Sequence, residues 1–242
     1  MAKSTKDRDR RAIVEEMRKK QQAQERRRTL IVFLAALAVG AVIIGFALVQ
    51  YLDTRAKENR DLSDIGVAKA AAACQPVKKE SAEGSGQHVA SGVKIDYDAA
   101  PPAYGKHDGT FLRGAEIKNQ YTEDDRPPVE KLVHSLEHGY TILWYDETIA
   151  DDPAAMADLN SIALKYPVGD KLIVAPWMES DGDAFPDDAH LALTHWVDSS
   201  PGDGDDDSQE GVWEYCGKVS GPVVQEFYDD YPAEKSPEPN GI

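Results

Sequence analysis

The sequence predicts a mixed α/β sandwich, with the element order of a thioredoxin-like fold, preceded by one transmembrane helix. Three observations support this prediction: an uncharged apolar run near the N-terminus, a strong charge asymmetry along the chain, and alternating strand-like and helix-like segments in the C-terminal part. The chain has 242 residues, which suffices for one ordinary domain with attachments. Its mean hydropathy of −0.50 indicates that most of the chain faces water.

The apolar run has the length of a membrane-spanning helix. No charged residue occurs from Thr29 to Leu52. Residues 30–51 would span about 33 Å as a helix, enough for the hydrocarbon core of a bilayer. The apolar part of a cleaved signal peptide is shorter, about 7–15 residues. We therefore expect an uncleaved transmembrane helix at residues 29–52.

The distribution of charge predicts the orientation of this helix. Residues 1–28 contain eleven Lys and Arg and five Asp and Glu, which gives them a charge of +6. Because the whole chain has a net charge of −16, the remaining 214 residues must have a charge of −22. Arg26–Arg28 directly precede the span, and cytoplasmic flanks are enriched in Lys and Arg. The basic tail 1–28 is therefore expected in the cytoplasm and the acidic part outside, in a single-pass protein of the cell membrane. Such an acidic domain repels nucleic acid, which excludes a DNA- or RNA-binding role.

The exported part is expected to comprise a stalk (53–73), a globular domain (74–231) and a loose tail (232–242). Pro128 suits the first turn of a helix and Gly139 suits its C-terminal end. Strands are expected at 88–97, 140–145, 171–176 and 190–197, and helices at 128–138, 153–166 and 219–231. This order is typical of a three-layer α/β sandwich.

The chain contains two cysteines, Cys74 and Cys216, and no C-x-x-C pair. This excludes a thioredoxin-type redox motif and a zinc ribbon. Outside the cytoplasm, two cysteines far apart in the sequence most simply form one disulfide, which we predict here. Two unpaired thiols are the alternative.

The motif with the clearest chemistry is HSLEH, from His134 to His138. Two histidines four residues apart lie one above the other on a helix and can bind one metal ion. The string also fits the H-x-x-E-H pattern of some metallopeptidases, in which Glu137 would act as a general base. The helix is expected to end at Gly139, however, and no helical glutamate follows as a third ligand. Two solvated histidines that favour the helix dipole are the structural alternative.

Further donors for a metal occur elsewhere in the chain. His107 lies in a proline-stiffened loop, His88 follows a glycine-rich turn, and Met178 follows a strand. We expect His107, His134 and His138 to converge, with Glu137 or Met178 nearby. A methionine ligand would suit copper, and the glutamate would suit zinc. His190 and His195 lie on a predicted strand and are expected to be structural.

The string VHSLEHGYTILWYD, Val133–Asp146, resembles the signature of a bacterial family known as domain of unknown function 3105. The segment PPAYGKH, Pro101–His107, is similar to the family's Pro-Pro-x-Ser-Gly-x-His element, with Tyr104 in place of serine. The resemblance implies a membrane-anchored, exported domain from Cys74 to about Tyr231. It places His107, His134, Glu137 and His138 on motif positions, and it implies no established activity.

The sequence therefore favours an exported domain that binds copper or zinc through histidines. The alternative is a non-enzymatic accessory protein that docks on a membrane-protein partner. A metal-dependent hydrolase comes third, and whether the protein is an enzyme stays open. No nucleotide-binding or serine-hydrolase motif is present.

The expected orientation can be tested by protease protection. Protease added to intact spheroplasts should digest the C-terminal domain and leave residues 1–28 protected, because only the domain lies outside. Detergent-opened membranes serve as the control, in which both parts should be accessible. The reverse pattern would contradict the charge argument, and a soluble truncated product would show that a signal peptidase cleaves the chain.

Overall fold

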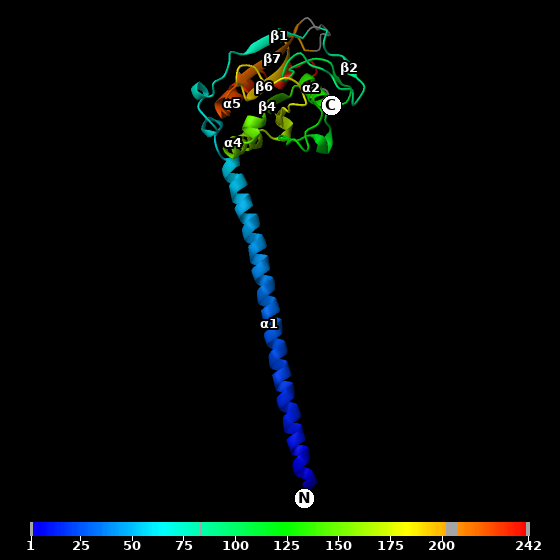
Figure 1. Ribbon diagram of the computed structural model, residues 1–242, viewed down its shortest axis with the longest axis vertical. Helices are drawn as coiled ribbons and strands as arrows, with labels where there is room; N and C mark the ends of the chain where they lie inside the picture. Colours follow the sequence, from blue (N-terminus) through cyan, green and yellow to red (C-terminus); the bar gives the residue numbers. More distant parts are fainter. Residues whose placement is uncertain (1, 83, 202–207, 241–242) are drawn as a thin grey trace. The chain divides into compact units, whose positions relative to one another are not determined.

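The computed structural model of the chain describes residues 2–82, 84–201 and 208–240 (Figure 1). The chain divides into a helical unit that ends at Ala56 and a globular unit that begins at Lys57. Helix α1 (Ala2–Glu58) forms the first unit and ends two residues beyond it. Its most apolar 18-residue window has a mean hydropathy of 2.8, and none of it is buried in the protein. By length and composition, α1 can span a membrane.

The globular unit is built on a five-stranded mixed sheet in the order β1-β7-β6-β4-β5. The strands are β1 (Lys78–Ser81), β4 (Thr141–Tyr145), β5 (Leu172–Pro176), β6 (Leu191–Asp198) and β7 (Gln209–Cys216). Strands β4 and β5 are parallel, and all other pairs are antiparallel. A parallel pair needs a crossover connection, which is formed here by α3 (Glu147–Ala150) and α4 (Pro153–Lys165).

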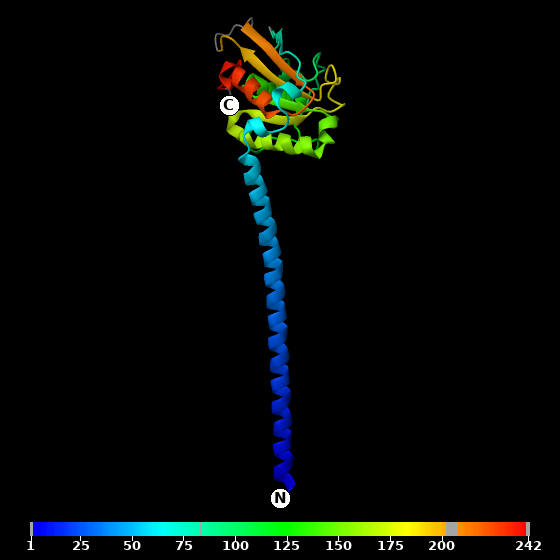
Figure 2. The ribbon, with the colours of Figure 1, turned by 90° about the vertical axis from the view of Figure 1, so that its left-hand side faces the viewer.

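Both faces of the sheet are covered, which gives a three-layer α/β architecture (Figure 1, Figure 2). One face packs on α4 and on α5 (Gly221–Asp230), through side chains that include Leu159, Ile162 and Phe227. The other face packs on α2 (Val129–Glu137) and on the long loops before it, through side chains that include Leu132 and Trp196. Alternate residues of β4, β5, β6 and β7 supply the two cores, as the pleat of a strand requires, whereas β1 is exposed.

The predicted mixed α/β class is confirmed, and so are six of its elements: α2, β4, α4, β5, β6 and α5. With β7, which was not predicted, they form a parallel β-α-β unit, an antiparallel hairpin and a closing helix, with strands in the order β5-β4-β6-β7. The element order expected from the sequence, which started with a strand at 88–97 and lacked β7, is therefore only partly found.

The predicted strand at 88–97 is wrong in its length. Only β2 (His88–Val89) forms, and it pairs in parallel with β3 (His107–Asp108) in a separate two-stranded sheet. Gly92 has a positive φ of 83°, which turns the chain, and the amide of Ile95 donates to the Glu130 side chain rather than to a strand. The strands β1 and β7 were not predicted.

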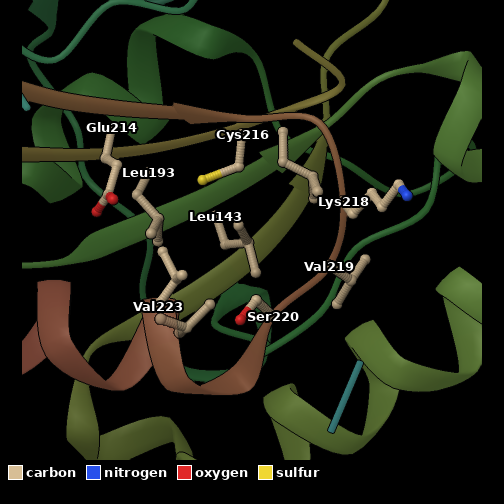
Figure 3. Close-up of a pocket in the computed structure, with 10 residues that line it drawn as sticks. Leu143, Leu193, Glu214, Cys216, Lys218, Val219, Ser220 and Val223 are labelled. Atoms are coloured by element: carbon tan, nitrogen blue, oxygen red, sulfur yellow. The ribbon is translucent and has the colours of Figure 1, made fainter. Parts of the chain in front are cut away.

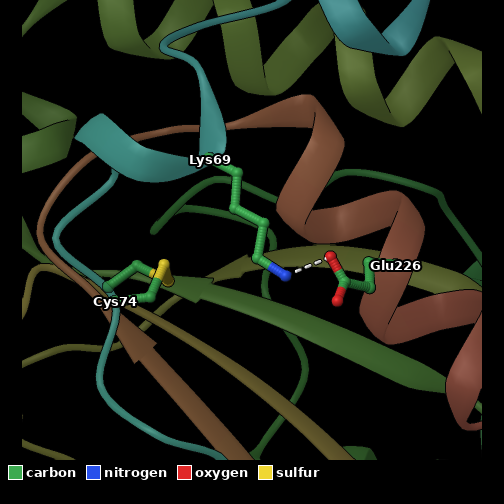
Figure 4. Close-up of a disulfide and its surroundings, with 4 residues drawn as sticks. Lys69, Cys74 and Glu226 are labelled. Atoms are coloured by element: carbon green, nitrogen blue, oxygen red, sulfur yellow. Dashed lines mark hydrogen bonds and ion pairs between the residues drawn. A yellow bond between two sulfur atoms is a disulfide. The ribbon is translucent and has the colours of Figure 1, made fainter.

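The predicted disulfide between Cys74 and Cys216 is present and joins residues 142 apart in the sequence (Figure 4). The segment before it, assigned to a stalk from the sequence, packs on the domain in its later part. Ile65 is fully buried, and Lys69 forms an ion pair with Glu226 of α5. The disulfide therefore fastens a segment that already contributes to the core.

Glu214 of β7 has a partly buried carboxyl group near the disulfide and α5. It lines a small cavity between the sheet and α5 together with apolar side chains such as Leu193 and Val223 (Figure 3). Burial raises the pKa of Glu214 to about 7, against the attraction of Lys69 and with the repulsion of Glu226 and Asp230. The unfolded chain, with an ordinary pKa, loses this proton first as the pH rises. Glu214 therefore lowers the stability of the fold progressively above about pH 4.5, up to about pH 7.

Replacement of this carboxyl by an amide should remove that penalty. We expect Glu214→Gln to stabilise the full-length protein at pH 8 by about 1–3 kcal/mol, or several degrees in Tm, and to have little effect near pH 4.5. Tryptophan fluorescence during heating in detergent measures the Tm at each of the two pH values. Glu210→Gln, on the same strand with a side chain that is 45% exposed, is the matched control. Equal Tm differences for Glu214→Gln at the two pH values would contradict the assignment.

Candidate metal centre

The short parallel sheet of β2 and β3 places two histidines opposite each other. His88 pairs with His107 in the register of this sheet. The amide of His107 donates to the carbonyl of Gln87 at 3.1 Å, and the His107 ring is completely buried. The imidazole rings of His88 and His107 lie 4.6 Å apart edge to face. Two distant parts of the loop region thus deliver two imidazoles to one place.

The loop before His107 is anchored on the main sheet. The indole nitrogen of Trp213 donates to the carbonyl of Pro101 at 2.7 Å. The ring of Tyr104 lies directly on Gly211 of β7, where a Cβ atom would stand only 2.1 Å from the ring. Only glycine allows this close approach. Tyr104, where the resembled family motif has serine, therefore has a packing role that fixes the path of the loop to His107.

Helix α2 contributes His134 from its last turn. The helix begins after Pro128 and ends before Gly139, whose φ of 86° favours glycine. Its apolar side packs on the sheet, and its other side is covered by the loop that carries β3. The His134 Nδ1 atom donates to the backbone carbonyl of Asp108 at 2.5 Å. This hydrogen bond joins α2 to β3 and turns the His134 ring towards His107, at a centroid distance of 4.7 Å.

His138 follows α2 and is held by the C-terminal segment of the chain. Its Nδ1 atom donates to the carbonyl of Glu238 at 3.1 Å, and the amide of Glu238 donates to the carbonyl of Glu137. Ser236, in the same segment, is fully buried. The described part of the segment assigned to a loose tail therefore packs against the end of α2, because these backbone groups complete each other's hydrogen bonds.

The hydrogen bonds of three histidines define the same tautomer. His107, His134 and His138 each use Nδ1 against a backbone carbonyl, those of Gly105, Asp108 and Glu238 respectively. A carbonyl only accepts, so Nδ1 carries the proton and the Nε2 atom of each neutral ring keeps a free lone pair. Metal-binding histidines in proteins show this arrangement, in which the second nitrogen is fixed by an outer hydrogen bond.

The free Nε2 atoms gather around one carboxylate oxygen. Glu137 Oε2 lies 3.1 Å from Nε2 of His107, 3.6 Å from that of His88 and 3.9 Å from that of His134. These four residues, here called the donor group, present donor atoms that all lie within 4.8 Å of one another. His138 adjoins the donor group, with its Nε2 atom 2.9 Å from Nε2 of His134.

Two of these atoms are buried without a hydrogen-bond partner. His107 Nε2 and Glu137 Oε2 lie 3.1 Å apart, but with the His107 proton on Nδ1 both atoms are acceptors, so neither satisfies the other. A buried polar atom without a partner costs about 1–3 kcal/mol. The donor group therefore has the property expected of a cation site, in which a bound ion would satisfy both atoms.

The charge state of the donor group also suits a cation. Burial lowers the pKa of His134 to about 4, against the hydrogen bond to Asp108 and with repulsion from His107 and His138. Burial alone would raise the pKa of Glu137, but the interactions with His107 and the neighbouring histidines outweigh it and lower that pKa. Near neutral pH the site thus contains a neutral His134 imidazole beside a carboxylate.

The predicted residues are brought together with one exception. His107, His134, Glu137 and His138 converge, and His88, which was outside the expected set, joins them. Met178 follows β5 and lines a separate pocket with Asp146 and Trp177, which none of these histidines lines. The two remaining histidines have other partners: His190 contacts Asp146 at 2.8 Å, and His195 contacts Thr141 at 3.0 Å.

The donor group and the motif strings lie within one family match. The model of the family described as protein of unknown function (DUF3105) matches residues 88–241. No curated protein and no solved structure matches the chain. The family match begins at His88, the first residue of the donor group, and covers more than half of the chain. The chain therefore belongs to the DUF3105 family.

Proposed function

We propose that the protein is a membrane-anchored, exported domain that binds one divalent transition-metal ion in the donor group. The observation that carries this proposal is the position of Glu137 Oε2, 3.1–3.9 Å from three imidazole nitrogens. Ligand atoms around a tetrahedral ion with bonds of 2.0–2.1 Å are about 3.3–3.4 Å apart. The distances from Glu137 Oε2 to the three nitrogens, 3.1, 3.6 and 3.9 Å, bracket this spacing.

The chemistry of the donors favours zinc. Three imidazoles and one carboxylate are ligands of intermediate softness, which suits Zn²⁺. The thioether argument for copper loses its support, since Met178 lines a different pocket. Copper(II) binds nitrogen donors more tightly than zinc in general, so availability as well as affinity decides which ion is held.

His138 supplies a fifth donor at the edge of the site. Its Nε2 atom lies 2.9 Å from that of His134, and in the neutral tautomers both atoms carry lone pairs. Two lone pairs at this distance repel each other unless a proton or a metal ion lies between or beside them. A cation shared by both rings relieves this repulsion.

Glu137 acts in this proposal as a ligand rather than as a general base. Its Oε2 atom lies among the imidazole nitrogens, which gives less support to the hydrolase alternative based on H-x-x-E-H. The Arg-rich flank of α1 supports a cytoplasmic N-terminus, and with that orientation the metal would be held outside the membrane. If the protein binds no metal, docking on a membrane-protein partner becomes the favoured function.

The variant His134→Ala tests the metal site. Wild-type full-length protein in detergent should bind about one zinc ion, and the variant should bind it about 100-fold more weakly or worse, because a buried ligand is lost. Competition with a chromophoric chelator measures the affinity, and elemental analysis measures the stoichiometry. His190→Ala removes a histidine outside the donor group and should leave both unchanged.

Thermal unfolding must show that the variant still folds. Wild-type protein that binds neither zinc nor copper above background would contradict the proposal. So would a folded His134→Ala variant that keeps wild-type affinity for both ions.

A further inference from the structure

His88 differs from the other members of the site in its exposure. Its side chain is 50% exposed, whereas those of His107, His134, Glu137 and His138 are at most 8% exposed. The side of the donor group on which His88 lies is therefore the side that meets solvent. His88 is therefore the member of the donor group that solvent contacts most.

His88 also lacks the outer hydrogen bond that fixes the other imidazoles. Among the described residues, no donor or acceptor is hydrogen-bonded to either ring nitrogen of His88. Its ring is held by stacking on His134, with centroids 4.9 Å apart and planes at 23°, and by the edge contact with His107. Its Nε2 atom also lies 3.6 Å from Glu137 Oε2, a distance longer than a hydrogen bond. Metal-binding histidines that stay in place usually have such an outer partner. His88 is thus positioned by weaker contacts.

The backbone around His88 gives it freedom as well. Strand β2 contains only two residues and belongs to a sheet of two short strands. If the His88 ring turned away, it would enter water and leave no buried polar group unpaired. If the His134 ring turned away, it would break the hydrogen bond to Asp108 and leave that carbonyl buried. Only the first movement is energetically cheap.

Building on the proposed metal site, we propose that His88 occupies an exchangeable coordination position. A small donor ligand of the imidazole, azide or water class takes this position when His88 turns away. The bond from His88 Nε2 to the metal breaks, and a bond from the incoming lone pair forms, with no change in oxidation state. His107, His134, Glu137 and His138 keep the ion in place during the exchange.

Such a position gives the site a capacity that a closed structural site lacks. Structural zinc sites have four protein ligands, whereas catalytic sites keep one position for water or substrate. An exported metal site with one replaceable ligand can accept a donor atom from another molecule. It can therefore transfer its ion to another molecule or activate a bound ligand. Both uses begin when the His88 side chain dissociates from the ion.

Cobalt(II) provides a direct test, because its visible spectrum reports the ligands of the ion. The full-length protein in detergent is loaded with Co²⁺ and titrated with azide and with imidazole. Wild type should show a saturable spectral change. His88→Ala should retain about one Co²⁺ and bind imidazole about 10-fold more tightly or better, because no side chain competes. His190→Ala should behave as wild type.

The possible outcomes separate this inference from the proposed function. A wild-type protein that does not bind Co²⁺ or Zn²⁺ contradicts the metal site itself. Retention of Co²⁺ without a spectral change in wild type or in His88→Ala shows a closed site and overturns the exchange position alone. Complete loss of Co²⁺ in His88→Ala would make His88 an essential ligand, which also overturns it.

Discussion

The hydrogen bond from His134 Nδ1 to the backbone carbonyl of Asp108 connects the two parts of the molecule that form the site. Helix α2 belongs to the main α/β sandwich, whereas Asp108 belongs to the small sheet of β2 and β3. Because Asp108 directly follows His107, this one contact sets the distance between the imidazoles of His107 and His134. It also fixes the His134 tautomer and leaves its Nε2 atom free for a ligand.

Burial gives this arrangement its chemical character. Two solvated histidines at the end of a helix were the structural alternative drawn from the sequence, and His134 and His138 lie on the side of α2 that does not pack on the sheet. That side of α2, however, is covered by the β3 loop, by Phe111 and by the C-terminal segment, so both rings are almost fully buried. Desolvation lowers the pKa of His134, and a neutral imidazole is the form that binds metals. The same burial holds the Glu137 carboxylate beside the neutral His134 ring, where a cation is favoured.

The elements that were predicted correctly are those defined by residues close together in the sequence. Helix α2 is defined by Pro128 and Gly139, and β4 by a compact apolar run, so both could be predicted from neighbouring residues. Strand β7 contains Glu210, Gly211 and Glu214, which weaken its apolar pattern, and its place in the sheet depends on pairing with β6. His88 could be recognised as a candidate, but its position beside His107 depends on a two-residue pairing that no local pattern encodes. Met178 was included because it follows a strand. The pocket that its side chain lines depends on how the strands and loops pack, which the local sequence does not encode.

The acidic charge of the globular unit and the chemistry of the donor group act at different ranges. A balance of −22 outside the basic tail attracts cations of every kind, but physiological salt screens this attraction beyond about 8 Å. The surface charge therefore raises the rate of encounter with cations and selects none of them. In the proposed metal site, selection would arise within the donor group, because imidazole nitrogens favour transition metals over Ca²⁺ and Mg²⁺. His88 is the exposed member of this group, so an ion attracted by the surface charge would meet its first nitrogen ligand there.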